Sequence, residues 1–176
     1  MRRDPIVIVD YDPRWPALFE RERAKIEVVI GDLLARAVEH IGSTAVPNLA
    51  AKPIVDMCAI VRDIDDLAAQ EGRLESIGWL AAPEPSDVQD RRRSYCTPSV
   101  ARRTHHLHVV EATSSAWRGW LAFRDHLRAH PDDASAYADL KRSLAADSPD
   151  PNDRTGYRAG KSGFIHELAR LAIEAK

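Results

Sequence analysis

The stretch from His40 to Met57, HIGSTAVPNLAAKPIVDM, combines residue types that suit ligand chemistry. Gly42 lets a backbone approach a ligand closely, and the hydroxyls of Ser43 and Thr44 stand beside amides that a turn exposes. Asp56 interrupts an apolar run, and a carboxylate in a buried strand must be paired, hydrogen-bonded or bound to metal. Two interpretations stay open: a structural turn with an acid that a neighbour satisfies, or a ligand site.

Three cations stand where the helical period of the C-terminal third predicts apolar residues. At about 100° per residue, Arg124 and Lys161 fall inside apolar arcs of their helices and Lys141 borders one. Tyr157 belongs to the same arc as Lys161. Each cation either pairs with a carboxylate such as Asp125, extends its charged end to water, or binds an anionic ligand. A phosphate-bearing ligand explains all three together.

The segment 104–111 contains two histidines that alternate with apolar residues. On a strand, His106 and His108 therefore share one face. No HExxH motif or cysteine pair completes a zinc-binding set around them. The arginine run 91–93 is interpreted either as a solvated edge or as a contact for a triphosphate.

Gly160-Lys161-Ser162 has the ending of a phosphate-binding P-loop, but the required first glycine is replaced by Thr155. The preceding residues form a polar loop, whereas a P-loop follows a strand. We therefore reject the P-loop interpretation.

The chain alternates strands and helices over its first two-thirds and then continues as helices. Short runs of branched residues predict strands, and capping residues with helical periodicity predict helices. Strands are expected at 6–9, 38–41, 54–61, 79–82, 94–97 and 104–111. Helices are expected at 12–35 with Asp12 as N-cap, 63–77, 114–129, 131–146 and 157–175. The order indicates an α+β fold, with helices packed on a mixed sheet and a helical C-terminal third.

Composition narrows the classes of function. The 176 residues favour one domain over 1–176, and 44% hydrophobic residues suffice for a substantial core. A formal net charge of −2 gives no strong nucleic-acid or membrane-surface signal. No apolar run reaches the length of a membrane span, and the two cysteines do not form a disulfide framework. We expect a cytoplasmic protein; its oligomeric state is left open.

The segment 40–57 resembles the signature of the GrpB family, which usually reads close to HIGSTSVPGLAAKPIID. Further blocks resemble the family in order and spacing over nearly the whole chain: Tyr11-Asp12-Pro13-x-Trp15, 104–109, 121–128, 137–141 and Tyr157-x-x-x-Lys161-x-x-Phe164-Ile165. Asn48 stands where the family commonly has glycine, and asparagine also tolerates a positive φ.

The resemblance implies a nucleotidyltransferase-like fold, because GrpB-like proteins are placed in that superfamily. Its pattern is a Gly-Ser turn followed by a strand that bears two acids one residue apart. Here the turn is Gly42-Ser43, and Asp56 follows Ser43 by 56 − 43 = 13 residues. Cys58 occupies the position of the second acid, which leaves one carboxylate for a divalent metal such as Mg²⁺ or Mn²⁺. Imidazole from His106 or His108 would shift the preference from Mg²⁺ toward Mn²⁺ or Zn²⁺.

Three functions follow from these residues. The first is nucleotidyl transfer from a nucleoside triphosphate to a small acceptor, with Asp56, His106 and His108 as catalytic residues and Asp56 and His108 as metal ligands. The second is a non-catalytic nucleotide- or anion-binding module, and the third is a metal-dependent phosphohydrolase. The ligand-binding residues expected in all three are Gly42, Ser43, Thr44, Lys52, Arg124, Lys141, Tyr157 and Lys161.

Overall fold

A computed structural model describes residues 6–70, 72–147 and 154–174. One mixed five-stranded sheet has the order β1-β2-β5-β4-β3. Its central pair, β2 and β5, is parallel, and the other neighbouring pairs are antiparallel. The strands are β1 (Glu39–Ile41), β2 (Val55–Val61), β3 (Leu80–Ala81), β4 (Arg92–Pro98) and β5 (Arg103–Glu111). The prediction of an α+β fold with a mixed sheet is confirmed.

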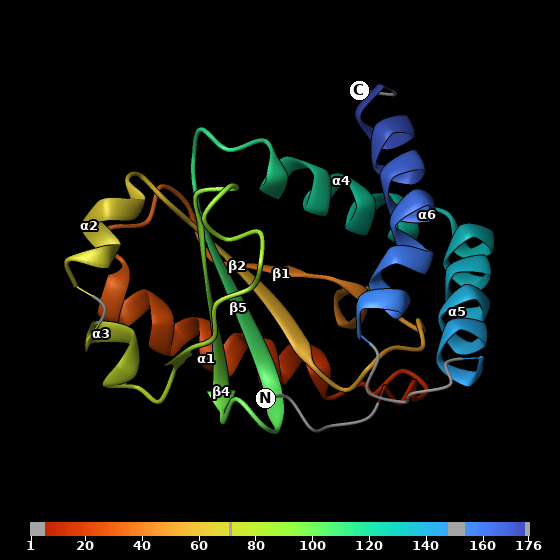
Figure 1. Cartoon of the computed structure of the whole chain (residues 1–176), viewed down its shortest axis with the longest axis horizontal. Helices are drawn as coiled ribbons and strands as arrows, with labels where there is room; N and C mark the ends of the chain where they lie inside the picture. Colours follow the sequence, from red (N-terminus) through yellow and green to blue (C-terminus); the bar gives the residue numbers. More distant parts are fainter. Residues whose placement is uncertain (1–5, 71, 148–153, 175–176) are drawn as a thin grey trace.

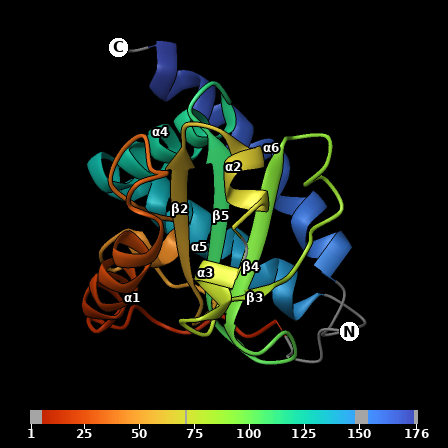
Figure 2. The same cartoon turned by 90° about the vertical axis from the view of Figure 1, so that its left-hand side faces the viewer.

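Helices lie on both sides of this sheet, as Figures 1 and 2 show. On one side are α1 (Trp15–Ile30), α2 (Ile64–Ala68) and α3 (Gly72–Glu75). On the other side are α4 (Ala116–Ala129), α5 (Pro131–Ala146) and α6 (Arg154–Glu174), which form the predicted helical C-terminal third. None of the helices in the described part of the chain is long and apolar enough to cross a membrane.

The main core lies between the sheet and α1 to α3. Alternate residues of the central strands, including Val55, Met57 and Leu107, pack there against helical residues such as Ile26 and Leu67. The spacing of the buried α1 residues explains why this segment is a helix, because they recur every three or four positions and form one stripe: Trp15, Phe19, Glu22, Ile26 and Ile30.

Several element boundaries differ from those that the sequence predicts. The segment 6–9 is not a strand and makes only an isolated bridge, from Val9 to Ala51. The helix α1 ends at Ile30, five residues before the predicted end, since Gly31 lies at its C-terminus and a turn follows. Asp12 caps the turn that precedes α1 by accepting a hydrogen bond from the Arg14 amide at 2.9 Å, whereas the N-cap residue is Arg14.

The single helix predicted over 63–77 is replaced by two short helices, α2 and α3. Asp63 caps α2 as predicted, because its carboxylate accepts a hydrogen bond from the Asp65 amide at 2.8 Å. Ile64, Leu67 and Leu74 are the buried residues of the two helices, so burial in the main core positions both. The helix predicted to start at residue 157 begins three residues earlier in the structure, at Arg154 of α6.

Candidate functional site

The parallel pairing of β2 with β5 brings the predicted catalytic residues together. Asp56 lies opposite His106 in the register, and Cys58 lies opposite His108. Because side chains alternate across a strand, these residues share the sheet face that turns toward α4 to α6. Farther along the same face, Cys58, Ile60 and Val110 pack against Trp117 and Trp120 of α4. The prediction that His106 and His108 share a face is therefore confirmed.

Asp56, His106 and His108 form a cluster in which one potential ligand atom from each residue lies within 4.8 Å of those of the other two. The Nδ1 atom of His106 is 3.4 Å from Oδ1 of Asp56, and the Asp56 side chain is 34% exposed. Burial alone would raise the pKa of Asp56. The hydrogen bond from His106 and the electrostatic effects of His106, His108 and Lys52 outweigh burial and hold this pKa below its usual value. Asp56 is therefore a carboxylate at neutral pH.

Hydrogen bonds fix the orientation of both imidazoles, from Arg103 at the start of β5 for His106 and from Ser94 of β4 for His108. Arg103 donates from Nη1 to Nε2 of His106 at 2.6 Å, so Nδ1 of that ring carries the hydrogen and donates to Asp56. Ser94 donates its hydroxyl hydrogen to the Asp87 carboxylate at 3.0 Å, so toward Nδ1 of His108, at 3.3 Å, it is the acceptor. The lone pair of His108 is then on Nε2.

These orientations separate the roles of the two histidines. His106 holds Asp56 in place, whereas His108 has a ring nitrogen available to a metal ion. Burial lowers the pKa of His108 to about 4, so its imidazole is neutral at pH 7, as a metal ligand must be. One carboxylate and one imidazole suit Mn²⁺ or Zn²⁺ better than Mg²⁺, which prefers oxygen ligands. Asp56 and His108 thus belong to a group that could hold a divalent metal ion, and of the two metals that the sequence predicts, these donors suit Mn²⁺ better than Mg²⁺.

The backbone of the Gly42-Ser43 turn packs against the Asp56 side chain. Gly42 has a φ of +69°, and a Cβ atom added to it would lie 2.8 Å from Oδ2 of Asp56. Glycine is required here both by the backbone conformation and by the close approach. The turn continues as a short 3-10 helix over Ser43–Ala45. Asn48, in the loop that follows, has a φ of +63°, as its tolerance for this conformation predicts.

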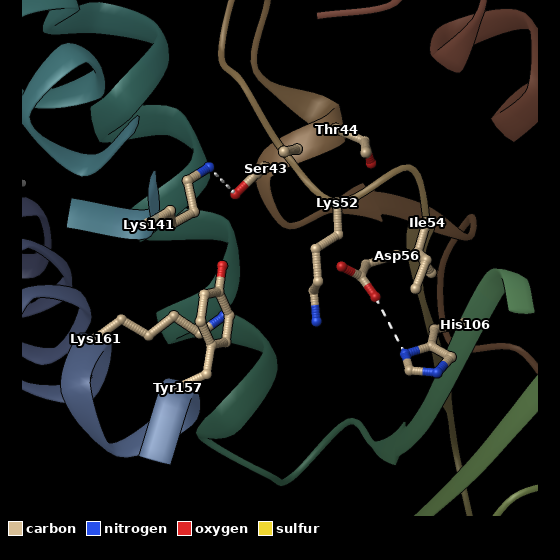
Figure 3. Close-up of a pocket in the computed structure, with 10 residues that line it drawn as sticks. Ser43, Thr44, Lys52, Ile54, Asp56, His106, Lys141, Tyr157 and Lys161 are labelled. Atoms are coloured by element: carbon tan, nitrogen blue, oxygen red, sulfur yellow. Dashed lines mark hydrogen bonds and ion pairs between the residues drawn. The ribbon is translucent and has the colours of Figure 1, made fainter. Parts of the chain in front are cut away.

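A cavity of about 70 Å³ opens between this turn, the start of β2, and helices α5 and α6 (Figure 3). It is lined by residues from five segments: Ser43, Thr44, Ala51, Lys52, Ile54, Asp56, His106, Lys141, Tyr157 and Lys161. A cavity of this size holds a few waters or one phosphate-sized group. It is much smaller than the roughly 300–1,000 Å³ of sites that enclose a drug-sized ligand.

Three lysines converge on the cavity from different parts of the chain. Lys141 of α5 is buried and donates to the Ser43 hydroxyl at 2.9 Å and to the Ala50 carbonyl. Lys52 and Lys161 place their ammonium groups over the Tyr157 ring, at 5.3 Å and 4.9 Å from its centroid. Asp56 is the one carboxylate among the cavity-lining residues. The lining therefore carries more positive than negative charge.

Burial and the neighbouring positive charges disfavour the protonated forms of the cavity lysines. Burial and the charges of Lys161, Arg142 and Lys52 lower the pKa of Lys141 to about 7. Burial also lowers the pKa of Lys161, although Asp56 opposes this change. An anion in the cavity would reverse these effects, because it would stabilise the protonated amines.

The Tyr157 side chain adds a hydroxyl hydrogen-bond donor to the cavity lining. Its hydroxyl is buried and has no hydrogen-bond partner among the described residues, although buried polar groups are nearly always paired. Figure 3 shows this oxygen between the ends of Lys141 and Lys52. A ligand oxygen in the cavity would give the hydroxyl its partner.

Arg124 is a predicted ligand-binding residue that the structure places outside the cavity lining. Its guanidinium contacts the Glu39 and Asp125 carboxylates at 2.9 and 2.8 Å and donates to the His40 carbonyl at 2.9 Å. This is the alternative in which the cation pairs with protein carboxylates. Arg128, which the sequence did not single out, donates to the Ala45 carbonyl at 2.9 and 2.7 Å. Both arginines thus attach α4 to the segment that carries the Gly42-Ser43 turn.

Most of the predicted site is brought together. Seven predicted residues line the cavity together with His106: Ser43, Thr44, Lys52, Asp56, Lys141, Tyr157 and Lys161. Gly42 lies against Asp56, and His108 lies beside His106. The orienting residues Asp87, Ser94 and Arg103 were missed, because an isolated polar residue on a strand or loop gives no signal of its partner. The rejected P-loop segment is part of α6, which supports its rejection.

Comparisons with known proteins identify the family of the chain and a solved structure with a similar fold. The sequence matches the GrpB protein family over residues 5–170. The UPF0157 protein YqkA of Bacillus subtilis is 38% identical over 160 residues, which cover 91% of this chain and 45% of YqkA. The chain therefore spans less than half the length of that relative. The crystal structure of the conserved protein GrpB from Enterococcus faecalis superposes with a TM-score of 0.84 at 32% identity, over 96% of this chain and 98% of that one.

One further relative is a protein named as an enzyme. The dephospho-CoA kinase of Mycolicibacterium paratuberculosis is 30% identical over 192 residues, which cover 97% of this chain and 46% of that protein. A segment similar to nearly the whole chain therefore forms less than half of a longer protein there.

Proposed function

The chain belongs to the GrpB family, and from this premise we propose that it binds the phosphate groups of a nucleotide and transfers a nucleotidyl group to a small acceptor. The observation that carries the proposal is the cavity lined by Lys52, Lys141, Lys161 and Tyr157, whose buried hydroxyl has no hydrogen-bond partner within the described part of the chain. Three cations and a hydroxyl donor match the charge and the acceptor oxygens of a phosphate group. The remainder of a nucleotide lies outside, since about 70 Å³ accommodates little more than one phosphate.

Each residue has a role that follows from its contacts. Ser43 and Tyr157 donate hydrogen bonds to phosphate oxygens, and the lysines neutralise phosphate charge. Asp56 and His108 hold a divalent cation, for which Mn²⁺ is the best match to their donor atoms. When bound, such a cation supplies positive charge to the triphosphate oxygens. His106 keeps the Asp56 carboxylate oriented toward the cavity.

In the proposed reaction, an acceptor hydroxyl forms a bond to the α-phosphorus of a nucleoside triphosphate. The bond from that phosphorus to the bridging oxygen breaks, pyrophosphate leaves, and the hydroxyl proton passes to solvent. The residues of the chain bind the triphosphate and orient it for this displacement.

A second candidate is a nucleotide- or anion-binding module without turnover. The observation that favours it is Cys58, which is fully buried where the superfamily pattern has its second acid. Burial raises the pKa of the Cys58 thiol to about 12, so it stays a neutral thiol and cannot replace a carboxylate. A site with a single carboxylate binds metal more weakly than one with two.

Binding and turnover with Asp56→Asn separate the two candidates. We would measure thermal stabilisation by ATP, GTP, CTP and UTP, each with and without Mn²⁺. A ligand at about 100 times its dissociation constant adds about 2.7 kcal/mol to the free energy of unfolding. Stabilisation that needs Mn²⁺ and is lost in Asp56→Asn supports transfer, and pyrophosphate release confirms it. Stabilisation by nucleotide alone that survives in Asp56→Asn supports the binding module. No stabilisation under either condition contradicts both.

Dephospho-CoA belongs in the same screen. The similarity to a segment of a protein named dephospho-CoA kinase makes this phosphate-bearing nucleotide derivative a specific ligand candidate. Stabilisation by dephospho-CoA beyond that by ATP at equal concentration would assign the ligand class. A weaker effect than that of ATP would remove this candidate.

A further inference from the structure

A second group of metal-ligating side chains lies where α4 meets α5, away from the cavity residues. His126 is in the last turn of α4, His130 lies between the helices, and Asp133 is in the first turn of α5. One ligand atom from each residue lies within 4.8 Å of those of the other two. The proposed nucleotide site uses none of these three residues, and none of them lines its cavity.

The rings of His126 and His130 lie next to each other. They are four positions apart, and their rings stack with centroids 4.0 Å apart and planes at 14°. Nδ1 of His130 is 2.9 Å from the His126 carbonyl oxygen. Since a carbonyl only accepts, Nδ1 carries the hydrogen, and the lone pair of the neutral ring is on Nε2. A hydrogen bond from one ring nitrogen to a carbonyl, with the other left for the ion, is the usual arrangement of metal-binding histidines.

Asp133 completes the set. Its Oδ2 atom is 2.6 Å from Nε2 of His126, so in the metal-free protein one proton joins these two atoms. Zinc bonds of about 2.0–2.2 Å to nitrogen and oxygen at a tetrahedral angle would separate them by about 3.4 Å. The contact therefore needs to open by less than about 1 Å. His130 is exposed and the Asp133 side chain is 40% exposed, so both side chains have room to adjust.

We propose that His126, His130 and Asp133 form a Zn²⁺ site that fastens α4 to α5. Two imidazoles and a carboxylate are a typical zinc donor set, and the fourth position is left for water. The zinc ion takes the place of the proton between His126 and Asp133. Because α5 carries Lys141 and α4 carries Arg128, the clamp joins the two helices that contact the Gly42-Ser43 loop.

Competition between Co²⁺ and Zn²⁺ in the metal-free chain of residues 1–176 tests the site. All variants carry Asp56→Asn, so that the Asp56 group contributes less to the signal, and no nucleotide is present. We expect a visible Co²⁺ spectrum of the tetrahedral type that Zn²⁺ displaces. His130→Ala should weaken Zn²⁺ binding by more than about 100-fold, since loss of a ligand costs more than loss of a hydrogen-bond partner of a ligand.

His166→Ala is the matched control, because His166 is an exposed histidine of α6 outside the cluster. The same affinity in His130→Ala and His166→Ala, or no Zn²⁺ binding at all, would overturn the proposal. Asp133→Asn is the second test, since it keeps the side-chain shape and should also weaken binding. If Asp133→Asn binds Zn²⁺ as tightly as the parent does, the carboxylate is not a ligand and the proposed site is wrong. These outcomes do not depend on nucleotide binding.

Discussion

The two faces of strands β2 and β5 have opposite chemistry. Toward α1 to α3, the strands present Val55, Met57, Leu107 and Val109, all of which are almost completely buried in the main core. Toward α4 to α6, the alternate positions present Asp56, His106 and His108, and the apolar Cys58, Ile60 and Val110 follow farther along the same face. The same backbone therefore supplies stability on one face and ligand chemistry on the other. Because β2 and β5 are central strands, the rigid core holds the polar residues in place.

The polar residues on the second face lower the free energy of unfolding relative to apolar residues at the same positions. Three lysines share one small cavity, and a tyrosine hydroxyl is buried without a partner in the described residues. Such costs are typical of functional sites, where a ligand provides what the protein alone lacks. Mutations on the two faces should therefore have different effects: stability falls on the first face, and ligand affinity falls on the second.

The largest effect is expected from Leu107→Ala on the apolar face. Leu107 has no exposed surface, so the mutation leaves a cavity and should lower the free energy of unfolding by about 2–5 kcal/mol. Urea denaturation measures this change. Sulfate affinity of the folded protein, measured by calorimetry, should stay within about twofold, since Leu107 points away from the lysines. A large loss of affinity would show that the two faces are coupled.

A smaller effect is expected from Lys161→Met on the polar face. The mutation removes one of three cavity cations and should weaken sulfate or triphosphate binding by about 10- to 100-fold, or about 1.4–2.8 kcal/mol. Stability should stay equal or rise, because a partly buried charge is replaced by an apolar side chain. Lys25→Met is the matched control, since Lys25 pairs with Glu22 on α1, away from the cavity. Equal affinities in the two variants would count against the anion site.

The pH dependence of sulfate binding sharpens the comparison further. Sulfate does not titrate in this range, whereas Lys141, with its pKa lowered to about 7, loses its proton. Between pH 6 and 8.5 the affinity should fall by up to about 30-fold, as the protonated fraction falls. Lys141→Met should remove most of this dependence. A flat profile in the unmutated protein would show that protonation of Lys141 is not required.

Lys141 should also make the stability of the ligand-free protein depend on pH. Stability should rise with pH, whereas sulfate affinity should fall. The folded-state pKa of Lys141, about 7, is below the unfolded value of 10.5. Between these two pH values the unfolded chain binds more protons, so this residue makes the free energy of unfolding rise with pH. Below pH 7 both states are protonated, and the contribution is constant. Urea denaturation of Lys141→Met and the unmutated protein at pH 7 and 9.5 measures the difference.

The smallest effect is expected from Tyr157→Phe. Loss of one hydroxyl donor should weaken sulfate binding by about 0.5–1.5 kcal/mol, or about 2- to 12-fold. Without ligand, the variant should be at least as stable as the unmutated protein, because the removed hydroxyl has no partner in residues 6–70, 72–147 and 154–174. Calorimetry and thermal unfolding measure the two quantities. A large loss of stability without ligand would contradict the absence of a partner.

Local patterns in the sequence were sufficient for much of the fold. Strands β2 and β5 were predicted within one residue at each end, because alternating or continuous runs of branched residues depend only on neighbours in the chain. The break between α2 and α3 was not predicted, since burial of Leu67 and Leu74 under the sheet positions two separate short helices. The end of α1 was placed too late for a similar reason: the turn after Gly31 leads the chain to a bridge between Leu34 and Val61.

For the candidate site, too, the sequence indicated the unusual residues and the tertiary structure determined their partners. Residue types and spacing alone determined that Gly42, Ser43, Asp56, Lys141 and Lys161 are unusual for their elements. Only the tertiary structure decided that Lys141 reaches Ser43 across 98 positions of the chain, and that Arg124 instead pairs with Glu39. The physical reason is that a charge in an apolar stripe reveals a need for a partner, whereas strand register and helix packing determine which partner is within reach.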